Sequence, residues 1–246
     1  MKVIGIIPAR YGSSRLPGKP LKLIMGKPMI QHVYEQALKT KNLDTVVVAT
    51  DDERIMDTVK SFGGTAFMTR ADHPSGSDRI AEVAKAYECD IVVNIQGDEP
   101  MIQPEIIDEF VDALKVDPQA VMATGCAEIF EKEKYENPNV VKVVTDLNGD
   151  ALLFSRSVIP YPRYRESFAV YEHIGIYVYR KDFLMKYITL APTPLSTTES
   201  LEQMKVLEHG YKIKVVKTQY THEAMSVDTQ EDLEAVEAIM KAKMGG

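Results

Sequence analysis

A cationic, glycine-containing segment from Pro8 to Pro20 is the part of the sequence best suited to carry chemistry. Glycine lets backbone N–H groups approach an anion closely, and arginine and lysine offset its charge. We therefore predict that this segment binds phosphate groups rather than serving only as a solvated basic loop. Its cations are Arg10, Arg15 and Lys19, and Ser13 lies among them.

The spacing of this segment excludes two common phosphate-binding motifs. Five residues rather than four separate Gly12 from Gly18, and Pro20 stands where a Walker A loop needs Ser or Thr. The segment also lacks the G-x-G-x-x-G pattern of dinucleotide-binding proteins. Because a proline disfavours helical geometry in the residue before it, we expect Lys19 to project from an extended loop rather than from a helix terminus.

Two aspartates are the candidate metal ligands. Asp98 follows an apolar run directly, and Asp228 lies far along the chain. Mg²⁺ prefers hard oxygen ligands and is usually bound by one or two carboxylates together with substrate phosphates. We predict that both aspartates hold Mg²⁺ beside the cationic segment. The alternative is that Asp98 caps a turn and Asp228 caps the last helix.

A Ser-Gly turn before a predicted helix is the candidate for reading a nucleotide base. It lies between His73 and Arg79, and it contains Ser75. Hydroxyl and backbone N–H groups at such a turn can hydrogen bond to the edge of a base. The same groups can also serve only to cap the helix, so both interpretations stay open.

The elements that would position these residues alternate between strands and helices. Three short runs of β-branched, apolar residues are typical of strands buried on both faces, and helical stretches with polar faces separate them. This order predicts a doubly wound sheet with ligands beyond the carboxyl ends of its strands, where the polar segments would meet. The runs are 3–7, 45–49 and 91–95, and the helical stretches are 28–39, 53–62 and 77–87.

The second half of the sequence is more mixed. It contains strand-like runs at 140–145, 151–154 and 174–179 and helical stretches at 201–209 and 230–241. A stretch rich in Pro, Tyr and Arg, residues 159–171, interrupts them. We predict one domain over residues 1–246, in which residues 150–180 form an excursion over the acceptor side of the site and a dimer contact.

Composition limits the classes of partner. The 246 residues are 45% apolar and 26% charged, as in ordinary globular proteins, and a net charge of −7 gives no general attraction to nucleic acid. Cys89 and Cys126 suggest neither a disulfide framework nor a zinc site. No signal peptide and no uncharged run of membrane-spanning length is found. We therefore expect a soluble cytoplasmic protein with no nucleic-acid or membrane partner.

In combination, the motifs resemble those of the 3-deoxy-manno-octulosonate (Kdo) cytidylyltransferase family over essentially the whole chain. The resemblance implies an α/β fold with a Rossmann-like mixed, mainly parallel sheet of the nucleotide-diphospho-sugar transferase, or glycosyltransferase-A-like, type. It rests on Ile7 to Leu21, Ala49 to Asp52, Ser75 to Arg79, Gln96 to Pro100, Val141 to Val144, Phe154 to Arg156, His173 to Tyr177, Glu199 to Gln203 and Val227 to Thr229.

The resemblance also implies roles for the candidate residues. The CTP phosphates would be held by Arg10, Arg15 and Lys19 with Ser13 beside them, and the nucleotide would further contact Ser75, Arg79 and Gln96. Mg²⁺ would be held by Asp98 and Asp228. Lys19, Arg15 and the two aspartates would be the catalytic residues.

A second set of residues would line the pocket for the sugar acid. A sugar acid carries a carboxylate and many hydroxyls, so its pocket needs arginines and hydrogen-bonding groups. From the residues alone, a satisfied buried histidine and a solvated helix face are the alternatives. The implied set is Gln96, Arg156, Arg163, His173, Tyr177, Glu202 and Gln203.

Two positions depart from the family pattern. Glu172 stands where the family usually has Lys or Arg, and Lys205 stands where Arg is common. An anion beside an anionic acceptor could alter which sugar acid is preferred, or its side chain could point into solvent. Lysine at position 205 keeps the charge but loses the planar fork of arginine.

The implied reaction is attack of the anomeric hydroxyl of Kdo on the α-phosphorus of CTP. It would release pyrophosphate and give CMP-Kdo for lipopolysaccharide or capsule synthesis, in a homodimeric, Mg²⁺-dependent enzyme. The alternatives are the same reaction on amino-Kdo or a sialic-type acid, a nucleotidylyltransferase for sugar 1-phosphates, and a catalytically silent nucleotide-binding regulator.

Overall fold

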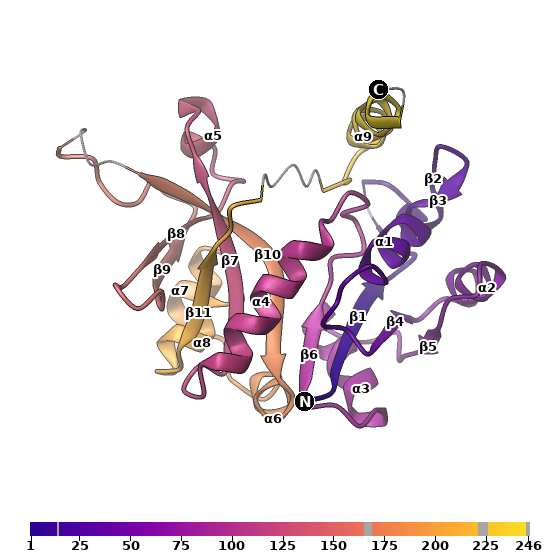
Figure 1. The fold of residues 1–246 in the computed structure, drawn as a ribbon, viewed down its shortest axis with the longest axis horizontal. Coiled ribbons are helices and arrows are strands. Elements are labelled where there is room, and N and C mark those ends of the chain that lie inside the picture. Colours follow the sequence, from indigo (N-terminus) through magenta and orange to yellow (C-terminus); the bar gives the residue numbers. More distant parts are fainter. Residues whose placement is uncertain (14, 165–168, 221–225, 245–246) are drawn as a thin grey trace. The chain divides into compact units, whose positions relative to one another are not determined.

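The computed structural model describes residues 1–13, 15–164, 169–220 and 226–244 (Figure 1). Contacts between residues group the chain into two compact units. The first unit comprises residues 1–107 together with 223–246, and the second comprises residues 108–222. Division into compact units by contacts does not test whether residues 1–246 form one domain, so the single domain stays a prediction.

The first unit is built on parallel strands. The three predicted strands are confirmed, since β1 pairs on one side with β4 and on the other with β6, while β5 extends the sheet beyond β4. Their apolar residues are buried along nearly their whole length, as expected of strands covered on both faces. The strands are β1 (Val3–Ala9), β4 (Thr45–Thr50), β5 (Ala66–Met68) and β6 (Ile91–Asn94).

Helices connect these strands at the predicted places. Helices α1 and α3 pack on β1 and β4, and α2 packs on β4 and β5. The sequence analysis missed the short hairpin of β2 and β3 and the helix α4, whose residues run from the first unit into the second. The bounds are β2 (Leu23–Ile24), β3 (Lys27–Pro28), α1 (Met29–Ala37), α2 (Glu53–Ser61), α3 (Gly76–Ala86) and α4 (Pro104–Val116).

The last described segment of the chain returns to the first unit. Helix α9 (Gln230–Met244) packs its apolar residues Leu233 and Val236 against Leu16 and Ile24, which lie in and just after the cationic segment. Val227 belongs to the same buried cluster. The chain therefore holds the residues around position 228 next to the cationic segment.

The second unit contains a mixed sheet. Strand β7 pairs antiparallel with β10 and parallel with β11, while β8 pairs antiparallel with both β9 and β10. Three of these strands were predicted, and β7 and β11 were not. The elements are β7 (Met122–Ile129), α5 (Lys132–Glu136), β8 (Lys142–Thr145), β9 (Ala151–Ser155), β10 (Val170–Arg180), α6 (Lys181–Tyr187), α7 (Pro194–Thr198), α8 (Met204–Glu208) and β11 (Ile213–Lys217).

One glycine sets how closely the second unit packs. The ring of Phe110, which is fully buried, occupies the space that a Cβ atom on Gly125 would need. Glycine at this position of β7 therefore lets an aromatic ring lie directly on the strand. The α/β class and the mainly parallel sheet that were predicted are confirmed.

Within the described parts of the chain, no helix has both the length and the apolar character needed to cross a bilayer.

Candidate active site

The cationic segment begins where β1 ends and leads into a short 3-10 helix, η1 (Lys19–Leu21). Gly18 precedes this helix with a φ angle of 66°, a conformation that favours glycine. The extended geometry predicted for Lys19 was wrong. Proline is tolerated near the start of a helix, where its missing N–H group is not needed, and the Leu21 N–H closes the turn on the Gly18 carbonyl at 2.9 Å.

Four charged side chains of the first unit meet beyond the carboxyl ends of β1 and β6. We call them the carboxylate cluster, and they are Arg15, Lys19, Asp98 and Asp228. The ammonium of Lys19 donates to Asp98 Oδ2 at 2.7 Å and to Asp228 Oδ1 at 3.0 Å. Arg15 Nη2 donates to the other oxygen of Asp228 at 2.9 Å. The two distant aspartates therefore lie within hydrogen-bonding distance of one cationic nitrogen.

Backbone contacts bring these two aspartates together. The N–H of Val227 donates to the carbonyl of Asp98 at 2.9 Å, which fixes the residue before Asp228 against the loop after β6. Gly97 allows this loop to approach β1, because a Cβ atom there would lie 2.7 Å from the carbonyl oxygen of Pro8. The juxtaposition thus depends on main-chain geometry as well as on charge.

The capping alternative for Asp228 does not describe its side chain. Thr229 caps helix α9, since its hydroxyl accepts from the N–H of Asp232 at 3.2 Å. The carboxylate of Asp232 accepts in return from the N–H of Thr229 at 2.9 Å, which completes a capping box. The carboxylate of Asp228 is thereby left to the two cations of the cluster.

The cluster is electrostatically balanced around Lys19. Burial alone would lower the pKa of Lys19, but the charges and hydrogen bonds of Asp98 and Asp228 outweigh it and raise that pKa above its ordinary value. The Lys19 side chain is only 15% exposed, so solvent screens these contacts weakly. Lys19 is therefore a fixed positive charge between two carboxylates.

The donor set suits a hard divalent ion. Asp98 and Asp228 both direct a carboxylate oxygen at one position, now taken by the Lys19 ammonium, and two carboxylates with substrate phosphates are a usual magnesium environment. Among the described residues there is no group of three or more His, Cys, Asp or Glu side chains that could hold a metal ion unaided. The two aspartates thus fit Mg²⁺ that arrives with a phosphate ligand.

The other nucleotide-side candidates lie in the same unit. Ser75 caps helix α3, because its hydroxyl accepts from the N–H of Asp78 at 3.2 Å and donates to the Asp78 carboxylate at 2.6 Å. The guanidinium of Arg79 is buried and donates to Asp51 Oδ2 at 3.0 Å and to the hydroxyl of Thr69. These contacts are a helix cap and a buried ion pair, and a contact of either residue with a base stays a prediction.

Three further candidates border the cationic segment and the loop after β6. Arg10 is exposed just after β1, and Gln96 is partly buried just after β6. The hydroxyl of Ser13 accepts from the N–H of Leu16 at 3.3 Å and so helps to shape the segment. Their positions at the carboxyl ends of β1 and β6 agree with the predicted edge of the sheet.

The sequence analysis missed a stacking contact on the cationic segment. The guanidinium of Arg54 lies 3.3 Å from the centre of the Tyr11 ring, and it is held there by a two-point ion pair with Asp52 at 2.7 and 2.9 Å. The Tyr11 ring in turn lies over Gly18. The Asp-x-Arg spacing at the start of α2 was the available signal for this contact.

Arg156 is the best-connected candidate in the second unit. Its guanidinium donates to the carbonyls of Glu199 at 2.7 Å and of Pro138 at 3.0 Å. The carboxylate of Glu199 accepts from the Arg156 N–H and from the hydroxyl of Ser155, both at 2.6 Å. Arg156 is therefore held by its main chain and by its side chain.

An aromatic row runs through the same unit. The ring of His173 lies 4.8 Å from Phe154 and 5.4 Å from Tyr177, between ring centres. Nε2 of His173 is 2.9 Å from the hydroxyl of the buried Thr124. Burial, with the nearby charge of Glu202, raises the pKa of the Tyr177 hydroxyl, which therefore stays a neutral hydrogen-bonding group.

The remaining acceptor-side candidates are placed differently. Glu202 is exposed and accepts a hydrogen bond from the hydroxyl of Tyr187 at 3.0 Å, whereas Gln203 is buried. Arg163 is exposed in the segment after β9. The ammonium of Lys205 lies over the Tyr187 ring, 3.9 Å from its centre, and so makes a cation–π contact within the second unit.

Glu172 forms an ion pair. Its carboxylate lies 2.6 Å from the ammonium of Lys134 on helix α5, and its side chain is only 18% exposed. The Glu172 side chain therefore does not point freely into solvent. Its negative charge is paired with Lys134, a cation of the same unit.

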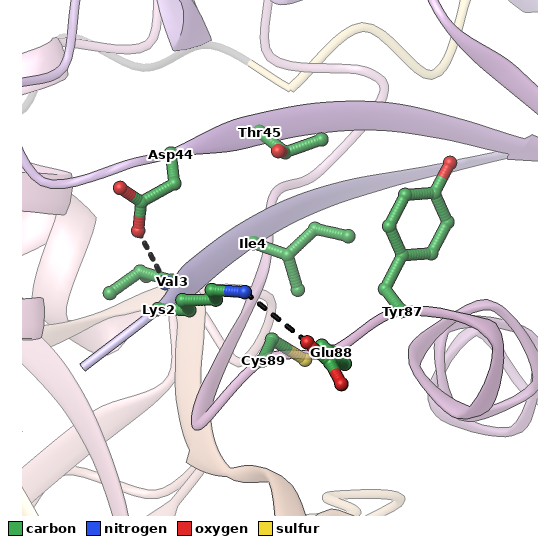
Figure 2. Close-up of a pocket in the computed structure, with 8 residues that line it drawn as sticks. All are labelled: Lys2, Val3, Ile4, Asp44, Thr45, Tyr87, Glu88 and Cys89. Atoms are coloured by element: carbon green, nitrogen blue, oxygen red, sulfur yellow. Dashed lines mark hydrogen bonds and ion pairs between the residues drawn. The ribbon is translucent and has the colours of Figure 1, made fainter.

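A hollow of about 230 Å³ lies at the opposite, amino-terminal ends of β1 and β4 (Figure 2). Its polar groups bond to one another. Lys2 Nζ is 3.3 Å from Glu88 Oε2, and Asp44 accepts from the N–H of Val3 at 2.7 Å. The predicted site residues lie elsewhere, so this hollow is not part of the candidate active site.

Comparisons with known proteins agree with the motifs. The model of the cytidylyltransferase family matches residues 4–213. A 3-deoxy-manno-octulosonate cytidylyltransferase of Fusobacterium nucleatum subsp. nucleatum is 53% identical over 237 residues, which cover 96% of each chain. One from Solibacter usitatus is 50% identical over 99% of this chain and 96% of that relative. The chain belongs to the 3-deoxy-manno-octulosonate cytidylyltransferase family.

A solved structure extends the similarity to three dimensions. It is that of a CMP:2-keto-3-deoxy-manno-octonic acid synthetase complexed with CTP, and it is 47% identical to this chain with a TM-score of 0.95. The match covers 99% of this chain and all of that one. The Kdo cytidylyltransferase fold is thus present from end to end.

Proposed function

We infer that the protein transfers CMP from CTP to the anomeric hydroxyl of Kdo, giving CMP-Kdo and pyrophosphate. The observation that carries this inference is the identity of about half of all residues, over nearly the whole chain, with relatives that bear the name of this activity. The similarity to a synthetase solved in complex with CTP supports the choice of nucleotide.

The first unit would bind the nucleotide triphosphate. Arg10, Arg15 and Lys19 carry the positive charge that offsets the phosphates, and Arg15 and Lys19 would stabilise the charge that develops on the departing pyrophosphate. Asp98 and Asp228 would hold Mg²⁺. When bound, this ion would offset further charge on the phosphate oxygens.

The chemical step needs no covalent enzyme intermediate. The oxygen of the sugar hydroxyl attacks the α-phosphorus in line and gives up its proton to solvent, the bond from that phosphorus to the bridging oxygen breaks, and pyrophosphate leaves with that electron pair. Positioning and charge stabilisation supply most of the catalysis in such reactions. A fixed cation such as Lys19 is suited to this role because its carboxylate neighbours already hold it in place.

The second unit would bind the sugar acid. Arg156 and Arg163 offer cations for the carboxylate, and His173, Tyr177 and Glu202 offer hydrogen-bonding groups for hydroxyls. Gln203 belongs to the same proposed set, and a role of Gln96 in binding the acid stays a prediction. The pairing of Glu172 with Lys134 favours an ordinary acceptor preference, since it leaves no unbalanced anion at that position.

A panel of nucleotides and acceptors tests the proposed reaction. With CTP and Mg²⁺ we expect pyrophosphate release on addition of Kdo and no release with sugar 1-phosphates. If amino-Kdo or a sialic-type acid is preferred, the proposed acceptor is wrong but the proposed type of reaction stands. Preference for UTP or ATP would overturn the nucleotide, and absence of turnover with every ulosonic acid would reject the function and favour a silent regulator.

Two further properties belong to the proposal. The protein would act as a homodimer, which is supported by the exposed aromatic side chains Tyr161 and Tyr164 in the predicted contact segment. It would act in the cytoplasm, and its product would serve the synthesis of lipopolysaccharide or capsule.

A further inference from the structure

Lys142 is a fully buried lysine in strand β8 that the proposed function does not use. It stands between valines in the sequence Val141-Lys142-Val143, where an apolar residue would be expected at a buried position. A buried charge is costly unless its hydrogen-bonding capacity is satisfied. Its surroundings therefore indicate what it does.

Three main-chain carbonyls surround the Lys142 ammonium. They belong to Asn137 at 3.0 Å, to Val140 at 2.6 Å and to Arg156. An ammonium has three N–H donors and no acceptor, so each donor is matched by one carbonyl. A neutral apolar side chain of the same length would take this donor from all three carbonyls, of which that of Asn137 also accepts from the N–H of Val140 at 3.2 Å.

The same turn is held from the other side by Arg156. Lys142 binds the carbonyls at both ends of the turn formed by residues 137–140, and the guanidinium of Arg156 donates to the carbonyl of Pro138 within it. The carbonyl of Arg156 in turn accepts from Lys142. The two cations and the turn thus form a closed ring of hydrogen bonds.

The strand of Lys142 also contacts a second acceptor-side residue. The N–H of His173 donates to the carbonyl of Val141 at 2.8 Å, and Glu172 is the register partner of Lys142 across β8 and β10. Lys142 therefore lies between the segments that carry Arg156 and His173. A shift of its side chain would disturb both.

Nearby carboxylates oppose part of the cost of burying this charge. Burial lowers the pKa of Lys142, the charge of Arg156 lowers it further, and the charges of Glu199 and Glu172 act in the opposite direction. Glu199 also accepts from the N–H of Arg156 at 2.6 Å, so it holds the same main-chain segment as Lys142. The arrangement is a charged, fully hydrogen-bonded support beneath Arg156.

We propose that Lys142 is a positioning residue for the sugar-acid pocket: its ammonium, held by the three carbonyls, fixes the 137–140 turn and Arg156 so that the guanidinium can meet the acceptor carboxylate. This proposal rests on the proposed function, because the acceptor is the sugar acid of that reaction. Glu199 acts with Lys142 by holding the Arg156 main chain.

The test compares kinetic constants of Lys142→Met with those of the wild-type protein, using CTP and the ulosonic acid that the wild type accepts. We expect the KM for the acid to rise about tenfold or more, since three carbonyls lose the Lys142 donor and Arg156 loses one of the contacts that hold its main chain. The KM for CTP should stay within about twofold. Lys132→Met, an exposed lysine on α5, is the matched control.

Chemical rescue separates positioning from packing. In Lys142→Ala, n-propylammonium has the size and the N–H donors of the missing atoms, so we expect it to lower the KM for the acid. The neutral n-propanol should not. Equal recovery with both compounds, or with neither, would show that the cation is not what matters and would overturn the proposal.

Glu199→Gln keeps the proposal testable if the lysine variants do not fold. It retains the shape of the side chain but removes a charge that holds the Arg156 main chain, so the KM for the acid should again rise while that for CTP does not. Unchanged constants in folded variants would refute the positioning role alone. Absence of wild-type turnover with any ulosonic acid would overturn the proposed function as well.

Discussion

Lys19 already makes, with Asp98 and Asp228, the kind of contact that a bound cation would make. The ammonium therefore keeps the two carboxylates close to each other. This explains how two acidic side chains can remain within a few ångströms of each other without strong repulsion. It also makes the removal of a single carboxylate informative.

Asp98→Ala should lower turnover by about 10²- to 10³-fold at saturating substrates, because the proposed metal loses one of its two carboxylates. CTP should still bind through the cations of the segment. Pyrophosphate release measures the first effect and titration calorimetry with CTP the second. Asp57→Ala, an exposed aspartate on α2, is the control, and near-normal turnover of the Asp98 variant would contradict the metal role.

Glu172→Gln should change the KM for the sugar acid by less than about fivefold, because a partly exposed ion pair contributes about 1 kcal/mol or less. Lys134→Gln removes the other partner and should give the same small effect. The acceptor panel run on both variants checks this. A change in the preferred acid would show that the charge at position 172 selects the acceptor.

Cys126 should make the protein less stable in alkali. Burial raises the pKa of its thiol to about 12, and Lys217 opposes this only in part, whereas an unfolded thiol titrates near ~8.5. The unfolded state alone loses this proton above that value, so the contribution to stability is lost as the pH rises from about 8.5 to 12.

The measurement is urea unfolding at pH 7.5 and pH 9.5, on the wild-type protein and on Cys126→Ala. The wild type should lose about 1.4 kcal/mol more of its free energy of unfolding over this interval than the variant does. Cys89→Ala controls for the loss of a cysteine. An identical pH dependence in wild type and Cys126→Ala would show that the thiol does not contribute.

At the scale of elements, the short 3-10 helix η1 shows how local rules fail. A proline predicts an extended residue before it, yet Gly18 in the left-handed region and the closing hydrogen bonds of η1 place Lys19 at a helix start. The rule describes an average backbone, and the hydrogen bonds here are specific to this turn. The chemistry expected of Lys19 does not depend on that difference.

Close packing between a ring and a strand gives a further prediction for an element. Gly125→Ala on β7 should lower the free energy of unfolding by about 1–3 kcal/mol, because the added methyl group meets the ring of Phe110. Urea unfolding measures this. Gly175→Ala on β10 is the control, since no heavy atom lies within 4 Å of its added Cβ, and equal losses in both variants would contradict the packing argument.

At the scale of the whole molecule, much of the first unit was predictable because its strands are uninterrupted apolar runs with polar segments at their ends. The pairing of Asp98 with Asp228 was proposed from chemistry, but its cause, the Val227 to Asp98 hydrogen bond, is a contact between distant segments. The position of Lys142 among valines is visible in the sequence. Its three carbonyl partners are not, because the fold brings them together.

The strands β7 and β11 were not predicted, and the sequence of β7 shows why. Met122–Ile129 contains Gly125 and Thr124 within its apolar residues, so it does not read as a continuous apolar run. The fold uses the glycine to seat a ring, as described for Phe110. Residues 165–168, which belong to the predicted acceptor excursion, lie outside the described residues.

The homodimer is the prediction for the whole molecule. Light scattering should give about twice the chain mass of 27.6 kDa. Because Tyr161 is 86% exposed and Tyr164 71%, an aspartate at either position should weaken association without unfolding the chain. Dimers that persist in both Tyr161→Asp and Tyr164→Asp would place the contact elsewhere, and a monomeric wild type would reject the dimer.

The return of residues 226–244 to the first unit has a consequence for biosynthesis. A nascent chain leaves the ribosome from its amino end, so β1, β4 and β6 emerge long before the segment that carries Asp228. The whole second unit is translated in between. Lys19 must therefore wait for its second carboxylate, and the proposed magnesium site is among the last features of the protein to be assembled.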